Sequence, residues 1–166
     1  MNDDVVALLF VAVERLERHL RAGEYIAVVA VEGQRTLVLS DYDYLRDHTD
    51  AAAFERRAAG HARRVSAARW VLAVPQVWVI NERDVAVRAA SPHPLRPGEQ
   101  EAITWMAFDH ADGVDYGRVP YARRPSGEPV FGEPEVFTVP LLPGELMPGY
   151  TLLRSLTSEE PSEDSR

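Results

Sequence analysis

The first apolar residues recur at spacings of three and four, a pattern that predicts an amphipathic helix over residues 3–22. Asn2 or Asp3 can cap its start, and Gly23 ends it because glycine readily adopts the left-handed conformation found after helices. The positions on the buried face are Val6, Leu9, Val13, Leu16 and Leu20.

The same spacing predicts a second helix over about residues 50–68, with Asp50 as its cap. A third helix is predicted from near Pro97 to around Gly113, because proline favours the first helical turn and "AITWMAFDH" continues from it. The apolar stripe of the second helix consists of Phe54, Ala58, His61, Val65 and Ala68.

Runs rich in Val, Ile, Thr and aromatic residues predict three strand pairs. The first joins "EYIAVVAV" to "RTLVLS", the second joins "RWVLAVPQVWVI" to "VAVRAA" through "NERD", and the third joins "GRVPYAR" to "PEVFTV" by a long loop. The first run is apolar almost throughout, which predicts a central strand covered on both faces. Pro75 cannot donate a ladder hydrogen bond, so it predicts a bulge or an edge position. "YTLLRSL" can form a last short strand or helix.

The element order is therefore α-ββ-α-ββ-α-ββ. This order predicts an α+β fold in which an antiparallel sheet built from hairpins carries its helices on one face. Residues 1–156 are expected to form a single domain. Residues 157–166, "TSEEPSEDSR", are expected to be a disordered acidic tail because they hold too few apolar groups to offset the entropy of folding.

Cysteine and lysine are both absent, and all 18 basic residues are arginines. The absence of cysteine excludes disulfides, thiol nucleophiles and thiolate metal sites. The absence of lysine excludes lysine general bases and the lysine of nucleotide-binding phosphate loops. The formal net charge of −8 repels phosphate backbones, so no nucleic-acid partner is expected.

The longest apolar run, "VVALLFVAV", has nine residues, whereas a membrane-spanning helix needs roughly 20. Asn2, Asp3 and Asp4 precede this run, and a secretory signal would have basic residues there. A cytoplasmic protein without a membrane partner is therefore expected.

Two chemical clusters stand out between residues 109 and 124. The first consists of Asp109, His110, Asp112 and Asp115, whose oxygen and imidazole ligands suit a divalent cation. Their spacing matches no common metal motif, and the alternative is a turn at Asp112–Gly113 whose charge is balanced by arginines of the following hairpin. No other cofactor is expected. His48 would join His110 at such a site if the fold brought their loops together.

The second cluster consists of Tyr116, Arg118, Tyr121, Arg123 and Arg124. Tyrosine and arginine are enriched at binding hot spots, and the planar arginine cation recognises carboxylates and phosphates through two hydrogen bonds. The alternative is a hairpin decorated with solubilising charge.

These observations favour a non-enzymatic binding or assembly protein that uses the Tyr/Arg/Pro-rich hairpin to engage a protein partner or another copy of itself. One alternative is a small metal-dependent hydrolase that uses the Asp/His cluster at the end of the third helix. Another is a small-molecule-sensing domain whose ligand the sequence leaves unknown. Its aromatic pocket would be built from Trp70, Trp78, Trp105 and Tyr121.

Overall fold

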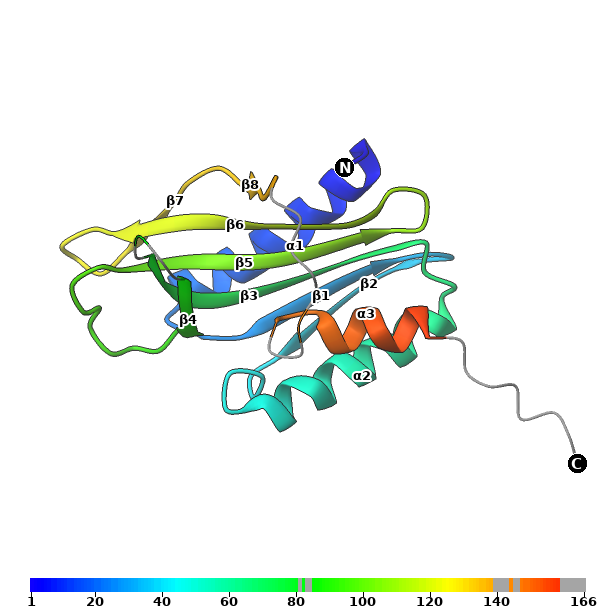
Figure 1. Ribbon diagram of the computed structural model, residues 1–166, viewed down its shortest axis with the longest axis horizontal. Helices are drawn as coiled ribbons and strands as arrows, with labels where there is room; N and C mark the ends of the chain where they lie inside the picture. Colours follow the sequence, from blue (N-terminus) through cyan, green and yellow to red (C-terminus); the bar gives the residue numbers. More distant parts are fainter. Residues whose placement is uncertain (81, 83–84, 139–143, 145–146, 159–166) are drawn as a thin grey trace, which may run out of the picture.

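An antiparallel sheet forms the middle layer of the protein, and helices cover both of its faces (Figure 1). The computed structural model describes residues 1–80, 82, 85–138, 144 and 147–158. In these residues the helices are α1 (Asp3–Arg21), α2 (His48–Arg64) and α3 (Tyr150–Thr157). The strands are β1 (Ala27–Glu32), β2 (Thr36–Asp41), β3 (Arg69–Ile80), β4 (Val85–Ala89), β5 (Glu99–Asp109), β6 (Gly113–Arg123), β7 (Pro129–Phe131) and β8 (Glu135–Val136). No helix of the described residues is long and apolar enough to cross a membrane.

The strands follow the order β2-β1-β3-β5-β6-β7, with β4 on the second half of β3 and β8 on β6. This order confirms the α+β class and the antiparallel sheet. Along one edge of β3, Pro75 lies between the residues that pair with β1 (as far as Ala73) and those that pair with β4 (from Gln76). On that edge its carbonyl accepts a hydrogen bond from the Ala90 N–H. Its missing N–H therefore leaves no ladder bond unmade, as the predicted edge position requires.

The predicted placement of helices on one face is wrong, because β1 is apolar on both faces and each face needs a cover. Val28 and Ala30 pack with α1 in one core. Val29 and Val31 pack with α2 and α3 in the other core. The predicted central strand is confirmed.

The predicted helix from Pro97 to Gly113 is also wrong, because residues 99–109 form strand β5 between β3 and β6. Alternate residues point to opposite faces: Trp105 packs in the α1 core and Met106 in the α2–α3 core. Ala and Glu are good helix formers, but pairing with a strand on each edge outweighs that local preference. Over the described residues the order is therefore α-ββ-α followed by six strands and a final helix.

Several boundaries are close to those predicted. Asn2 caps α1 as expected, but Asp47 caps α2, three residues before the predicted Asp50. "YTLLRSL" forms a helix. The third strand pair exists as β6 with β8, although β6 begins at Gly113 and β7 adds a further pairing. Part of the "NERD" turn and the tail from residue 159 lie outside the described residues.

Candidate functional site

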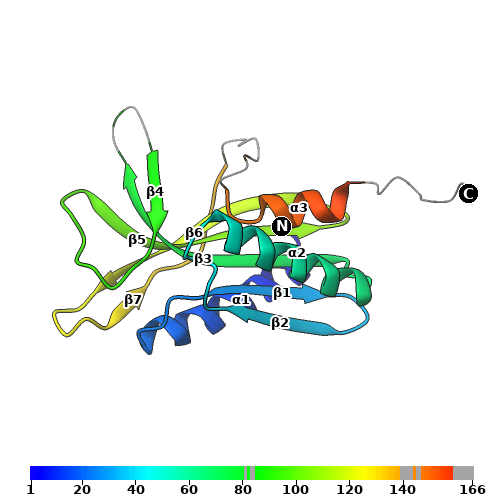
Figure 2. The same cartoon turned by 90° about the horizontal axis from the view of Figure 1, so that it is seen from below.

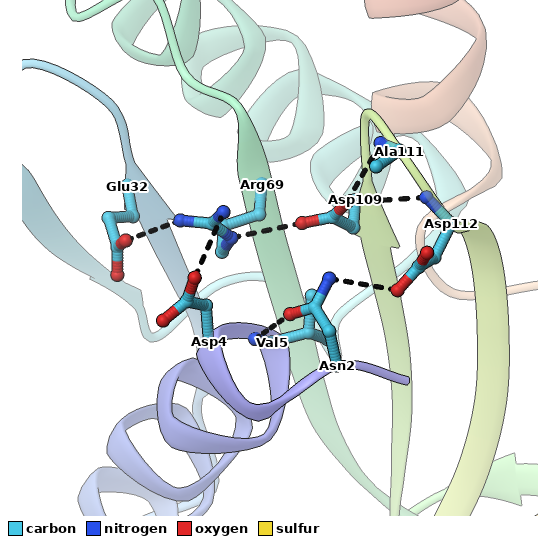
Figure 3. Close-up of polar contacts among 8 residues, drawn as sticks. All are labelled: Asn2, Asp4, Val5, Glu32, Arg69, Asp109, Ala111 and Asp112. Atoms are coloured by element: carbon cyan, nitrogen blue, oxygen red, sulfur yellow. Dashed lines mark hydrogen bonds and ion pairs between the residues drawn. The ribbon is translucent and has the colours of Figure 1, made fainter.

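The predicted metal cluster lies at the tight turn between β5 and β6, which Asp109 closes (Figure 3). Its Oδ1 accepts hydrogen bonds from the backbone N–H of Ala111 at 2.8 Å and of Asp112 at 3.3 Å. Its Oδ2 lies 3.0 Å from Nε of Arg69. Burial raises the pKa of Asp109, but the hydrogen bonds from Ala111, Arg69, Asn2 and Asp112 outweigh burial and lower the pKa below its ordinary value. Asp109 is thus a charged structural group whose oxygens are already occupied.

Arg69, at the start of β3, supplies the positive charge at this turn. It also lies 2.5 Å from Glu32 Oε1 and 3.5 Å from Asp4 Oδ2, so one guanidinium joins β1, β3, β5 and α1 (Figure 3). The predicted turn exists, but the charge of Asp109 is balanced from β3 instead of from the following hairpin.

The other members of the cluster have separate surroundings. His110 is exposed, and Asp112 accepts a hydrogen bond from the Asn2 side chain at 2.8 Å. Asp115 lies 3.7 Å from the amino group of Met1. Within the described ranges, no three acidic or histidine side chains gather into a group that could hold a metal ion, and this includes His48.

Four of the predicted binding residues lie on β6, distributed over both of its faces, and Arg124 directly follows the strand. Tyr121 is buried beside Phe131 on the α1 side, with ring centroids 5.0 Å apart. Tyr116 packs on the α2–α3 side. The structure therefore separates the two tyrosines.

Each of the three arginines has a carboxylate partner. The pairs are Arg118 Nε with Glu135 at 3.0 Å, Arg123 Nε with Glu101 at 2.8 Å, and Arg124 Nε with Glu128 at 3.7 Å. The Arg118 pair joins β6 to β8 and the Arg123 pair joins β6 to β5, whereas the Arg124 pair spans the turn before β7. The arginines thus hold this edge of the sheet, and their role in binding a partner stays a prediction.

A groove of about 680 Å³ opens on the α2–α3 side, where the sheet extends past the ends of the helices. Figure 2 shows the β3–β4 hairpin standing out from the sheet on this same side. The hairpin forms one wall, and the N-terminal ends of α2 and α3 form the other. The apolar lining includes Val74 and Trp78 of β3, Val87 of β4, Tyr116 of β6, Phe137 and Met147.

Trp78 is held firmly at this groove. Its Nε1 donates to Thr104 Oγ1 at 3.0 Å, which satisfies the polar edge of the indole. Its ring lies 5.6 Å from that of Phe137, and the Arg118 guanidinium lies 5.5 Å from its centroid. The apolar surface continues along the hairpin to Ile80, which is 55% exposed.

Glu55 of α2 is a buried carboxylate at the helix wall of the groove. It accepts hydrogen bonds from Tyr44 Oη at 2.7 Å and from the backbone N–H of Leu152 at 3.0 Å. Burial raises the pKa of Glu55, and these hydrogen bonds offset part of that rise. Burial and the neighbouring Glu55 carboxylate raise the pKa of Tyr44 well above its ordinary value. This carboxylate therefore fixes the start of α3 instead of standing free.

The sequence held a signal for Glu55 that the prediction missed. It is a charged residue beside Phe54 and Ala58 on the apolar stripe of α2, and a buried charge requires partners. Of the aromatic residues proposed for a sensing pocket, Trp78 lines the groove, whereas Trp105 borders it but packs its side chain in the α1 core. Tyr121 belongs to the other core.

Comparison with known proteins yields no protein-family model, curated protein or solved structure that matches the chain. The functional interpretation accordingly depends on the groove and on the chemistry of its side chains.

Proposed function

We propose that the protein is a non-enzymatic binding protein and that its groove holds an apolar segment of a protein partner. The observation that carries this proposal is the cluster of aromatic and aliphatic side chains, centred on Trp78, along an open groove of about 680 Å³. Contiguous exposed apolar surface of this kind is typical of interaction sites. Groove volumes of this size are also common for sites that bind ligands.

The shape of the apolar surface favours a peptide segment over a compact small molecule. The surface follows β3 from Val74 to Ile80, a length of roughly 20 Å at about 3.3 Å per strand residue. An amphipathic helix of about three to four turns, at about 5.4 Å per turn, has apolar anchors over a comparable length, and such helices bind in apolar grooves.

The chemistry of the groove favours binding over catalysis. Glu55 already accepts hydrogen bonds from Tyr44 and Leu152, so its oxygens are engaged by the fold. The Asp109 turn lies outside the groove lining and is likewise engaged, by Arg69. Neither carboxylate is therefore a free general base directed at a bound molecule.

The test is peptide-display selection on the intact protein, followed by affinity measurements on two matched variants. Val87→Asp places a charge on the groove, and Val130→Asp places the same charge on β7, away from it. These valines are 42% and 46% exposed, so both variants should fold. All three tryptophans fluoresce, but a change in the signal on binding reports occupancy at Trp78, because Trp78 is partly exposed in the groove while Trp70 and Trp105 are buried.

We expect selected peptides rich in apolar and aromatic residues, with affinity reduced at least about tenfold by Val87→Asp and unchanged by Val130→Asp. Peptides that bind both variants equally would show that the groove is not their site and would overturn the proposal. If the selection yields no peptide but a small apolar dye binds in a way that Val87→Asp abolishes, the proposal of a protein partner would be overturned in favour of a small ligand.

A further inference from the structure

Strand β2 is an edge strand of the sheet, and its outer edge has backbone groups that no described strand pairs with. It pairs with β1 from Thr36 to Asp41 without a bulge, and it contains neither proline nor glycine. Among the described residues, no strand pairs with its other edge. Proteins usually block such edges with proline, bulges or short strands, so a regular open edge indicates a surface available for pairing.

The direction of the backbone groups on β2 can be derived from its turn. Gly33 N–H donates to the carbonyl of Arg35, so Arg35 faces β1. Because successive strand residues direct their backbone groups to opposite edges, the N–H and C=O groups of Thr36, Val38 and Ser40 point outward. Three residues thus offer donors and acceptors at the spacing of an antiparallel ladder.

The sequence "RTLVLSD" is complementary to itself when two copies run antiparallel about Val38. The outward residues then face one another: Val38 meets its own copy, and Thr36 meets Ser40. Between them, Leu37 meets Leu39, an apolar pair on the α2 face. Arg35 meets Asp41 at each end. Centring the pairing on Leu37 instead places Arg35 opposite Leu39, and centring it on Leu39 places Asp41 opposite Leu37.

The charges at the strand ends are suited to this pairing. Within the part of the chain that the structure describes, Arg35 is exposed and has no carboxylate partner. Among the described residues, Arg57 is the one cation paired with Asp41, at 3.4 Å. Burial raises the pKa of Asp41, and the carboxylates of Asp43 and Asp50 also raise it against the effect of Arg57. A second cation beside Asp41 therefore stabilises its charged form.

We propose that two copies of the chain form a symmetric dimer by antiparallel pairing of β2 with β2, centred on Val38 and closed by Arg35–Asp41 pairs at both ends. Opposite-charge and apolar cross-strand pairs are the units that stabilise such a contact. The twofold axis is perpendicular to the joined sheet, so the α2–α3 layers of both copies lie on one side. The two grooves therefore open in the same direction. This inference does not depend on what the grooves bind.

Sedimentation of the full chain tests the dimer. Val38→Pro removes an outward N–H without removing a β1–β2 hydrogen bond, and Arg35→Asp places like charges opposite each other. We expect a wild-type dimer and, in each variant, a dissociation constant raised at least about tenfold. Circular dichroism checks that both variants keep their fold, and Ser40→Thr, which retains the backbone and the charges, serves as the matched control.

A charge exchange makes the test independent of folding losses. Asp41→Arg is combined with Arg57→Asp, which keeps the pair within the chain but reverses its signs. Alone, this variant should be monomeric, as should Arg35→Asp. An equimolar mixture of the two should form heterodimers, because each strand end then faces its opposite charge. A monomeric wild type, a dimer that survives both Val38→Pro and Arg35→Asp, or a mixture that stays monomeric would each overturn the proposal.

Discussion

The Glu55 carboxylate on α2 accepts a hydrogen bond at 3.0 Å from the backbone N–H of Leu152 on α3, 97 positions later in the chain. Gly149 occupies the N-cap of α3 and has no side chain to satisfy the first N–H groups of the helix. Glu55 therefore performs the capping from a neighbouring helix. A second link, from the Arg63 guanidinium to the Ser155 carbonyl, joins the other end of α3 to α2.

Glu55→Ala should lower the free energy of unfolding by about 3 kcal/mol, since Tyr44 Oη and the α3 N–H groups lose their buried acceptor. Tyr44→Phe should lower it by about 1–2 kcal/mol. Urea denaturation of both single variants and the double variant measures the coupling between the two side chains. Glu14→Ala is the control, because Glu14 is exposed on α1. If Glu55→Ala costs no more than Glu14→Ala, the capping role is wrong.

The pKa shifts of Glu55 and Asp109 predict opposite pH dependences. The folded-state pKa of Glu55 is raised, so its contribution to stability is fully present below about pH 4.5, the unfolded value, and is lost as pH rises through the folded pKa. The folded-state pKa of Asp109 is lowered, so its contribution is present above 3.8, the unfolded value, and is lost as pH falls through the folded pKa.

Unfolding free energies of wild type, Glu55→Gln and Asp109→Asn, measured across this pH range, check these signs. The advantage of wild type over Glu55→Gln should shrink as pH rises from about 4.5. Its advantage over Asp109→Asn should shrink as pH falls below 3.8. Two differences that change in the same direction would contradict the assignment.

Local sequence patterns predicted correctly the elements whose apolar residues are mostly buried in the core. The spacing on α1 and the continuous apolar run of β1 report their burial directly. The helix predicted over residues 99–109 was wrong because Glu101, Ala102 and Met106 favour a helix locally. The segment is a strand because it pairs with β3 and β6, and these partners are distant in sequence.

The site was harder to predict for the same reason. Trp78 and Tyr116 were both singled out from the sequence, but for different clusters. They line one groove only because β5 pairs with β3 on one edge and with β6 on the other. The contact between Glu55 and Leu152 spans 97 positions, so no local spacing could indicate it.

The adjacent arginines at the end of β6, Arg123 and Arg124, should differ sharply in their contribution to stability. Arg123 makes two hydrogen bonds to Glu101, at 2.8 and 3.2 Å, and Glu101 is only 4% exposed. Arg123→Ala leaves that carboxylate without its cation and should lower the free energy of unfolding by about 2 kcal/mol. This is less than the loss expected for a fully buried pair, because Arg123 is partly exposed. Arg124→Ala should cost less than about 0.5 kcal/mol, because its pair with Glu128 is exposed. Thermal and urea unfolding give both values, and equal losses would contradict the assigned role of Arg123.

Two glycine-to-alanine changes should affect stability in opposite directions. An added Cβ at Gly117 would collide with the Trp105 ring and with the Glu135 carbonyl of β8, neither of which can move without disturbing the sheet. Gly117→Ala should therefore lower the unfolding free energy by about 2–3 kcal/mol. Gly60 lies within α2, and an added Cβ there meets no atom within 4 Å. Gly60→Ala should therefore raise the unfolding free energy by roughly 1 kcal/mol, because alanine has the higher helix propensity and lowers the entropy of the unfolded chain. Urea denaturation of the two variants measures both effects. A Gly117→Ala protein as stable as wild type would show that the Trp105 ring does not pack against Gly117.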